Sequence, residues 1–299
     1  MKTLVIGAAI IDIIMKIDRL PRSGEDILCS ETISTVGGCA YNVASTLRNF
    51  GVDHDLFVPV GQGMYGNIIS GDLKKLGYHI LIKDEELDNG YCLCLVEAGG
   101  ERTFITVRGA EGRFRASWFD RLSGEDYENI YVAGYQVCGA GGGVISHWLE
   151  SLKGKRVFFA PGPSVTDIGR DVMERIFSVN PILHLNEKEA FDYTGQDTIQ
   201  DCIRELHRLN QNLVVVTLGD KGTMYCEKGE IGIVKACPTK VVDTIGAGDS
   251  HVAAMIAGYA MGGDTRHCVE LANRVASGIV GIQGPVMSRE MFEQRGYKL

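Results

Sequence analysis

Short apolar runs alternate with longer amphipathic stretches along most of the chain. We expect strands over 4–6, 55–60, 130–132, 157–159, 182–185 and 213–218. We expect helices over 41–49, 68–76, 145–152, 170–177, 187–193 and 199–210. Strands that alternate with helices are typical of a parallel sheet with helices on both faces. The pattern therefore predicts an α/β fold in three αβα layers around a mainly parallel central sheet.

Two stretches interrupt this alternation. Residues 27–34 are strand-like, and residues 91–97 and 103–107 flank a glycine-containing turn, which predicts a hairpin. Hairpins within a β-α chain often form a small separate sheet. We therefore expect a single domain over 1–299, in which about 12–35 and 90–110 form a β-sheet lid.

Composition and charge narrow the function classes. The formal net charge is −8, and Lys and Arg are not clustered with aromatic residues, which argues against a nucleic-acid partner. No apolar run is long enough to predict a membrane span. The apolar start of the chain contains Asp12 and no small-residue cleavage site, so we expect a buried strand there and not a signal peptide. Nine scattered cysteines are typical of reduced thiols in the cytoplasm.

The most informative segment is Asp-Thr-Ile-Gly-Ala-Gly-Asp at 243–249, between a strand-like stretch at 240–242 and a helix-like stretch at 250–261. Small residues at the start of a helix let backbone N–H groups approach an anion closely. A phosphoryl group in transfer needs such donors, and Asp249 is placed to accept the proton of an attacking hydroxyl. The alternative is an acidic residue that only stabilises a helix start.

Two N-terminal segments offer groups for binding hydroxyls. Asp12 follows an apolar run, and a buried carboxylate is costly unless it has partners. The glycines Gly37 and Gly38 would let a sugar lie against bare backbone, and Asn42 offers both a donor and an acceptor. The alternatives are an exposed turn at Asp12 and an ordinary loop and helix start at 37–42.

The segment at 243–249 resembles the C-terminal signature of the ribokinase-like (PfkB) carbohydrate kinase family, and further motifs in the family's order extend the resemblance over nearly the whole chain. The resemblance implies a ribokinase-like fold and an ATP-dependent kinase that phosphorylates a hydroxyl of a small molecule. It also implies that Asp249 is the catalytic base and that Gly246, Ala247 and Gly248 form the anion hole.

The N-terminal segments are similar to the family's substrate-binding elements. The stretch from Gly7 to Asp12 matches a strand-one motif, and residues 37–44 match Gly-Gly-x-x-x-Asn-x-Ala. The resemblance therefore implies substrate binding by Asp12, Gly37, Gly38 and Asn42. Relatives often place a polar residue near the end of the strand before the glycine cluster at 139–143, which makes Gln136 a further candidate. We expect the glycine cluster itself to be a flexible connection.

Three further motifs imply nucleotide and metal binding. Residues 186–189 match Asn-x-x-Glu, in which Glu189 would organise Mg²⁺, directly or through water. Residues 217–222 match a turn that approaches the nucleotide. The implied nucleotide-binding residues are Asn186, Thr217, Gly219, Gly222 and Asn273. Asp243 and the carbonyl of Ile245 match half of a monovalent-cation site, but 281–285 departs from the family's pattern for the other half, so K⁺ stays open.

Other functions have to be weighed against a kinase. The Gly-x-Gly-x-x-Gly run from Gly61 to Gly66 fits a dinucleotide fingerprint and would indicate a nicotinamide-dependent oxidoreductase. The family commonly has Val-Gly-x-Asp-x-x-Gly there, with Gly63 in place of the Asp. A non-catalytic sensor of sugar or nucleotide is a third hypothesis, but the retained Asp249 argues against it.

The acceptor is less clearly indicated than the reaction. Asp12 with Asn42 suits a neutral polyhydroxy ligand, so we rank a free sugar first. A nucleoside ranks second, with Phe104 or Tyr41 as an aromatic platform for its base. A sugar acid or sugar phosphate ranks third, because of the four arginines in or after the lid hairpin: Arg102, Arg108, Arg113 and Arg115. Exposed strand edges in the lid predict a homodimer that forms through it.

Overall fold

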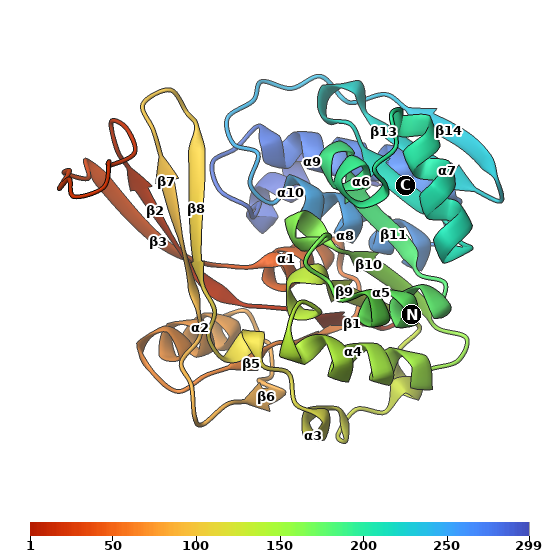
Figure 1. Cartoon of the computed structure of the whole chain (residues 1–299), viewed down its shortest axis with the longest axis horizontal. Helices are drawn as coiled ribbons and strands as arrows, with labels where there is room; N and C mark the ends of the chain where they lie inside the picture. The colour runs from red at the N-terminus through yellow and green to blue at the C-terminus, as the bar shows by residue number, and fades with distance from the viewer. Residues whose placement is uncertain (299) are drawn as a thin grey trace.

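The computed structural model describes residues 1–298 and contains a large sheet between two layers of helices, with a small sheet at one side (Figure 1). The large sheet has the order β14-β13-β12-β11-β10-β9-β1-β4. Its strands are β1 (Thr3–Ile6), β4 (His54–Phe57), β9 (Asn129–Ala133), β10 (Arg156–Ala160), β11 (Ile182–Asn186), β12 (Val214–Thr217), β13 (Thr223–Glu227) and β14 (Glu230–Val234). All neighbours from β12 to β4 are parallel, and β13 and β14 add an antiparallel edge. The expected mainly parallel αβα architecture is confirmed.

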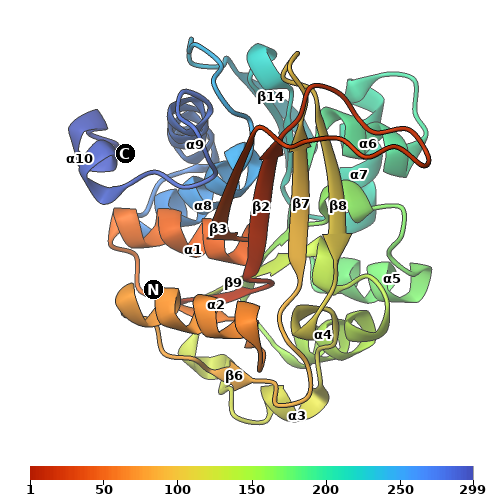
Figure 2. The ribbon, with the colours of Figure 1, turned by 90° about the vertical axis from the view of Figure 1, so that its left-hand side faces the viewer.

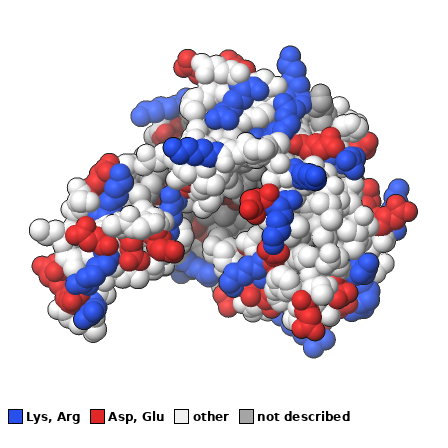
Figure 3. Space-filling model, turned by 90° about the horizontal axis from the view of Figure 1, so that it is seen from above, with Lys and Arg blue, Asp and Glu red and all other residues white. Residues whose placement is uncertain are grey.

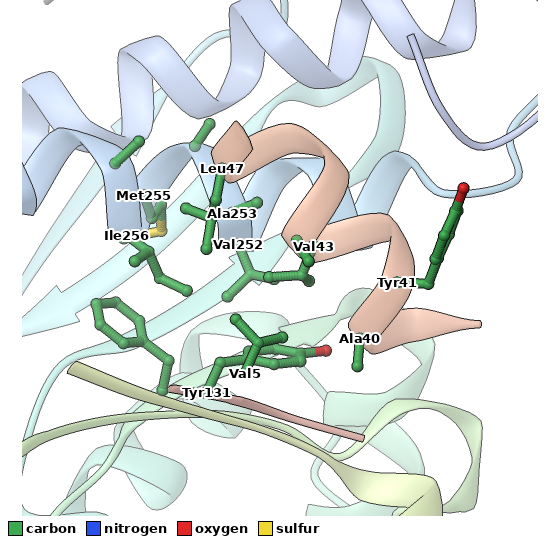
Figure 4. Close-up of a cluster of buried hydrophobic side chains, with 14 of the residues drawn as sticks. Val5, Ala40, Tyr41, Val43, Leu47, Tyr131, Val252, Ala253, Met255 and Ile256 are labelled. Atoms are coloured by element: carbon green, nitrogen blue, oxygen red, sulfur yellow. The ribbon is translucent and has the colours of Figure 1, made fainter. Parts of the chain in front are cut away.

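Helices cover both faces of the large sheet because its strands are apolar on both sides. In β1, Leu4, Val5 and Ile6 are all fully buried. Val5 belongs to a core with helices α1 (Cys39–Phe50), α8 (Ala247–Ala260), α9 (Thr265–Val280) and α10 (Arg289–Arg295). Leu4 and Ile6 belong to the opposite core, with α3 (Ala116–Phe119), α4 (Ala140–Ser151), α5 (Arg170–Ser178), α6 (Glu187–Thr194) and α7 (Ile199–Asn210). Figure 4 shows Val5 and Tyr131 facing Val43 of α1 and Val252 of α8.

The small sheet, which we call the lid sheet, stands apart from the rest of the molecule, which we call the body (Figures 1 and 2). It contains β2 (Ile10–Lys16), β3 (Glu31–Gly37), β7 (Tyr91–Val96) and β8 (Arg102–Val107) in the order β3-β2-β7-β8. The predicted hairpin is therefore present as β7 and β8. Helix α2 (Met64–Lys75) lies at the base of this sheet, and Figure 3 shows a hollow between lid and body.

The pairing register places specific side chains on the lid face that looks toward the body. Asp12 pairs with Cys92, and Cys92 with Thr106, so these three side chains share one face. At the far end of the same face, Lys16 pairs with Val96, and Val96 with Arg102. We call this the inner face of the lid sheet.

Several predicted boundaries were wrong. The strand at 55–60 is two strands, because the chain leaves the large sheet after Phe57 and β5 (Pro59–Val60) pairs instead with β6 (Ile82–Lys83). The strand at 27–34 begins only at Glu31. The stretch at 240–242 forms no strand, and its apolar residues Val241 and Val242 are 66% and 52% exposed. The antiparallel pair β13 and β14 had no counterpart in the sequence prediction.

The glycine cluster at 139–143 is helical, in contrast to the flexible connection that we expected. Helix α4 begins at Ala140 and includes Gly141 and Gly142. A Cβ atom at Gly141 would lie 2.8 Å from the carbonyl oxygen of Gln136, and one at Gly142 would lie 2.1 Å from that of Val137. The glycines are therefore needed because the helix start packs directly on the preceding backbone. No helix among residues 1–298 is long and apolar enough to cross a membrane.

Candidate active site

The predicted anion hole forms the start of helix α8. Gly246 precedes the helix with φ of 75°, a left-handed conformation that favours glycine, and a Cβ atom there would lie 2.6 Å from the carbonyl oxygen of Pro285. Ala247, Gly248 and Asp249 occupy the first helical turn. The first N–H groups of a helix have no carbonyl partner four residues back, so this turn can bind an anion.

Asp249 lies in this first turn and contacts a second predicted site residue. Its Oδ2 accepts a hydrogen bond of 2.8 Å from Nδ2 of Asn42 in α1. Burial raises the pKa of Asp249 to about 6, although hydrogen bonds from Asn42 and Cys39 act in the opposite direction. A base with this pKa is ionised at neutral pH and still able to hold a proton briefly.

Asp12 is placed differently from the prediction, because it lies in lid strand β2 and not at the end of β1. Its carboxylate packs on Gly37, where a Cβ atom would lie 1.9 Å from Oδ2 of Asp12. Gly38 has φ of 102°, and a Cβ atom there would lie 2.7 Å from the carbonyl oxygen of Ala8. Burial, and then the charge of Asp249, raises the pKa of Asp12 to about 6. The structure thus brings Asp12, Gly37, Asn42 and Asp249 together.

Gln136 is not in this group. It lies buried in the turn Gly134–Gln136, and its Oε1 has no hydrogen-bond partner among the described residues. Its neighbour Tyr135 lines the cavity beside Asp249, as does Cys39. Neither residue was predicted. Cys39 could have been suspected because it lies between Gly38 and Asn42, whereas nothing in the sequence distinguished Tyr135.

Two adjoining cavities meet at the start of α8. The first, about 290 Å³, lies between Asp249, Glu189 and Asn186, and the second, about 540 Å³, lies between β12, α8 and α9. Thr217 and Gly248 line both. The other four residues predicted to bind nucleotide also line these cavities: Asn186 lines the first, and Gly219, Gly222 and Asn273 line the second.

Asn273 is held in a buried network of hydrogen bonds. Its Oδ1 accepts from Thr223 at 2.6 Å and lies 3.1 Å from Nε2 of His251, and its Nδ2 donates to the carbonyls of Val234 and Lys235. The side-chain amide of Asn273 is therefore fully used in holding the cavity wall. His251 also contacts His184 at 2.8 Å, and burial lowers the pKa of both, that of His251 to about 4, so both rings are neutral.

Glu189 and Asn186 cap helix α6 reciprocally. Nδ2 and N of Asn186 donate to the two carboxylate oxygens of Glu189, at 2.7 and 3.0 Å, and Oδ1 of Asn186 accepts from N of Glu189. No cluster of three or more His, Cys, Asp or Glu suited to a metal occurs in residues 1–298. A single carboxylate beside an anion cavity fits Mg²⁺, which retains waters and binds phosphate oxygens. Because its oxygens already accept hydrogen bonds, Glu189 fits Mg²⁺ best through water.

Asp243, half of the predicted monovalent-cation site, is already paired with a cation of the chain. Arg102 Nη1 lies 2.5 Å from Oδ1 of Asp243. The same carboxylate accepts from the N–H groups of Ile245 and Gly284, at 2.8 and 3.0 Å. These hydrogen bonds and the guanidinium lower the pKa of Asp243, although its burial acts in the opposite direction.

The dinucleotide-like glycines serve a different purpose. The start of α2 binds the carboxylate of Asp88, which accepts from the N–H groups of Tyr65 and Gly66 at 3.1 and 2.6 Å. A Cβ atom at Gly63 would lie 2.3 Å from Oδ2 of Asp88. The Asp88 carboxylate thus binds the N–H groups of this helix start, which a dinucleotide fingerprint would leave for a pyrophosphate.

Comparisons with known proteins agree with this geometry. The pfkB family carbohydrate kinase domain matches residues 2–290. The chain is 37% identical to the uncharacterized sugar kinase YegV of Escherichia coli (strain K12) over 285 residues, which cover 94% of this chain and 89% of that protein. The structure of ribokinase from Thermotoga maritima covers 98% of both chains with a TM-score of 0.85 and 22% identity. Arabidopsis thaliana ribokinase, solved with ribose and ATP, covers 98% of this chain and 97% of its own with a TM-score of 0.80 and 22% identity.

Proposed function

Because the chain belongs to the pfkB family of carbohydrate kinases, we propose that it transfers the γ-phosphoryl group of ATP to a hydroxyl of a free sugar. The single observation that supports this most strongly is the position of Asp249. Its carboxylate lies in the first turn of α8, where two cavities meet, and contacts Asn42 at 2.8 Å. A base, an anion hole and a hydroxyl-binding amide therefore occupy one place.

In the proposed mechanism, the sugar binds between the lid sheet and the body. Asp12 accepts hydrogen bonds from its hydroxyls, and the bare backbone at Gly37 and Gly38 lets the ring approach closely. Asp249 accepts the proton of the attacking hydroxyl, and Asn42 fixes the orientation of the Asp249 carboxylate. An acceptor ordered in this way needs little further movement to reach the phosphorus.

The nucleotide would occupy the larger cavity, with its terminal phosphate at Gly246, Ala247 and Gly248. The N–H groups of this helix start stabilise the charge that spreads over the phosphoryl oxygens. Asn186 and Glu189 would hold Mg²⁺ through water, and the ion would supply positive charge to the phosphates. Thr217, Gly219 and Gly222 line the larger cavity and would hold the phosphates.

The lid arginines favour a neutral acceptor over an acidic one. Arg102 pairs with Asp243, and Arg115 pairs with both Asp84 and Glu86. Arg113 also pairs with Glu86. Of the four arginines considered, Arg108 alone has no ion pair among the described residues, so three of the four guanidinium groups already have acidic partners within the chain.

A nucleoside is the second candidate acceptor. Tyr41 is not a platform for a base, because it is buried and its hydroxyl donates to Asp72 at 2.6 Å. Phe104 is 53% exposed on the inner face of the lid sheet, in register with Cys94. An aromatic ring at that position is the observation that keeps a nucleoside in consideration.

The test is ADP release from ATP and Mg²⁺ across free sugars, nucleosides, sugar acids and sugar phosphates, each with and without K⁺. Stimulation by one free sugar above all other classes is the expected result. Stimulation by nucleosides alone would replace the first candidate by the second. No stimulation by any acceptor, with ATP still bound, would favour a non-catalytic sensor.

We also propose a cytoplasmic homodimer that forms through the lid. The nine cysteines are all free, as reduced thiols in the cytoplasm would be. The outer face of the lid sheet exposes Ile105 and Val107, 50% and 41% exposed, which a second copy could cover. Light scattering on the protein with Ile105→Glu tests this, since the variant should be monomeric if the lid forms the interface.

A further inference from the structure

We propose that Arg102 couples closure of the lid sheet to assembly of the anion hole, by supplying the positive charge that the Asp243 carboxylate requires. The proposal rests on the proposed kinase function. In this view, Arg102 is a positioning residue, because it acts on the phosphate-binding turn through Asp243. Its guanidinium would take the role that the sequence motif suggested for a monovalent cation.

The ion pair joins two separate parts of the molecule. Arg102 is the first residue of lid strand β8, at the tip of the hairpin, and Asp243 lies 141 residues further along the chain in the body. The Nη1–Oδ1 distance is 2.5 Å, and the side chains are 22% and 3% exposed. Among the ion pairs of residues 1–298, this pair alone joins the lid sheet to the body.

Asp243 in turn shapes the start of helix α8. Its Oδ1 holds the N–H of Ile245, and its Oδ2 holds the N–H of Gly284. The next residue, Pro285, packs on Gly246, where a Cβ atom would meet its carbonyl oxygen at 2.6 Å. One carboxylate therefore ties together the two loops whose contact fixes Gly246 in its left-handed conformation and so directs the N–H groups of the anion hole.

The charge balance explains why this carboxylate needs a cation. Asp243 accepts two backbone hydrogen bonds, from Ile245 and Gly284, but only Arg102 supplies it with a full positive charge. Breaking a buried ion pair by removing one side leaves the other charge uncompensated, which is strongly destabilising. Asp243 also lies close in sequence to the site where the terminal phosphate would bind, and an uncompensated negative charge there would oppose the phosphate.

The consequence is a link between acceptor binding and catalysis. Arg102 is on the same inner face as Asp12, so an acceptor that draws Asp12 toward the body also brings Arg102 to Asp243. With the lid raised, the 243–246 turn would lose its cation, and the anion hole would be incomplete. Hydrolysis of ATP without acceptor would then be slow, because the transition state is stabilised only in the closed form.

The first test compares Arg102→Ala, Arg102→Lys and the control Lys16→Ala. Lys16 lies in the same row of the inner face, but it pairs with Glu31 within the lid and is 46% exposed. We expect Arg102→Ala to lower kcat by about 10- to 100-fold, because small displacements of catalytic groups cost this much. Arg102→Lys should retain most of the rate, and Lys16→Ala should retain all of it.

A second measurement separates a positioning role from general damage. Potassium fits beside an unpaired carboxylate and choline does not, so KCl should partly restore kcat of Arg102→Ala relative to choline chloride at equal ionic strength. The wild-type rate should be indifferent to the choice of salt. Equal losses in Arg102→Ala and Lys16→Ala, or a wild-type protein that requires potassium, would overturn the proposal.

A third measurement does not depend on turnover and so distinguishes this proposal from the proposed function. Hydrogen exchange of a peptide that spans 243–250 should be faster in Arg102→Ala than in wild type, with the unfolding temperature little changed, and unchanged in Lys16→Ala. If the wild type phosphorylates no acceptor but this difference is found, the kinase proposal fails and the coupling stands. If exchange is the same in all three proteins, the coupling fails.

Discussion

The wall of the nucleotide cavity and the lid sheet differ in how their polar groups are satisfied. In the wall, Asn273, His251 and Thr223 bond to one another and are at most 7% exposed. In the lid sheet, Asp12 bonds to no other side chain of the described residues and faces the cleft, and one ion pair to Asp243 joins the sheet to the body. If the chain acts as proposed, the nucleotide side is built in advance, whereas the acceptor side would be completed by the sugar.

Asp249 lies in α8, at the first cavity, where both substrates would meet, and its replacement should have the largest effect. We expect Asp249→Asn to lower kcat by about 10³-fold or more, because a positioned base contributes this much. Nucleotide affinity should be unchanged, since the wall of the second cavity does not depend on Asp249 for its hydrogen bonds. Steady-state kinetics and ATP titration measure the two quantities. Turnover near that of wild type would remove Asp249 from the role of base.

A substitution on the lid side should affect the acceptor and leave the nucleotide unaffected. We expect Asp12→Ala to lower kcat/KM for the sugar by about 100-fold, because two or more hydrogen bonds to hydroxyls are lost. The KM for ATP should change by less than about threefold, since no wall residue contacts Asp12. Ser34→Ala is the matched control, because Ser34 pairs with Ile13 on the outer face. An equal loss for both substrates would contradict the separation of the two sides.

A substitution in the wall of the second cavity should weaken ATP binding and leave acceptor binding unaffected. Asn273→Ala removes the acceptor of the Thr223 hydroxyl, which then keeps only its contact with His251, and it removes the donor to the carbonyls of Val234 and Lys235. We expect a stability loss of about 2–4 kcal/mol, because unsatisfied buried polar groups cost about 1–3 kcal/mol each. Denaturation and ATP titration check this, with Arg266→Ala, an exposed residue of the same helix, as control. Weaker acceptor binding with unchanged ATP binding would contradict the assignment of the second cavity to the nucleotide.

The sequence predicted the body better than the lid, for a physical reason. Apolar runs such as 213–218 predict a buried strand, because a parallel sheet is covered on both faces. The lid depends on contacts between distant segments. No local pattern could reveal that Arg102 reaches Asp243 or that the Asp88 carboxylate binds the start of α2. Asp12 was assigned to the wrong strand. Only Gly7 and two apolar residues separate β1 from β2, so no polar turn in the sequence marked the end of the first strand.

The smallest effect concerns the cost in stability of the buried Asp249 carboxylate, and it follows from the sign of its pKa shift. Burial raises the pKa of Asp249 from 3.8 to about 6. A raised carboxyl pKa favours the folded state below the unfolded value, and this contribution is lost as the pH rises through about 6. At pH 8, ionised Asp249 therefore destabilises the fold, by about 1–2 kcal/mol after allowance for its partial exposure.

Asp249→Asn removes this penalty, because the amide oxygen can still accept from Asn42 but carries no charge. We expect the unfolding temperature of Asp249→Asn to exceed that of wild type by about 2–6 °C at pH 8, and the difference to vanish near pH 4. The exposed Asp18→Asn provides the control. The same ionisation governs turnover, so kcat/KM of the wild type should fall below pH 6 as Asp249 gains a proton. A stability difference that grows as the pH falls would reverse the sign and show that Asp249 is stabilised, not strained, in its site.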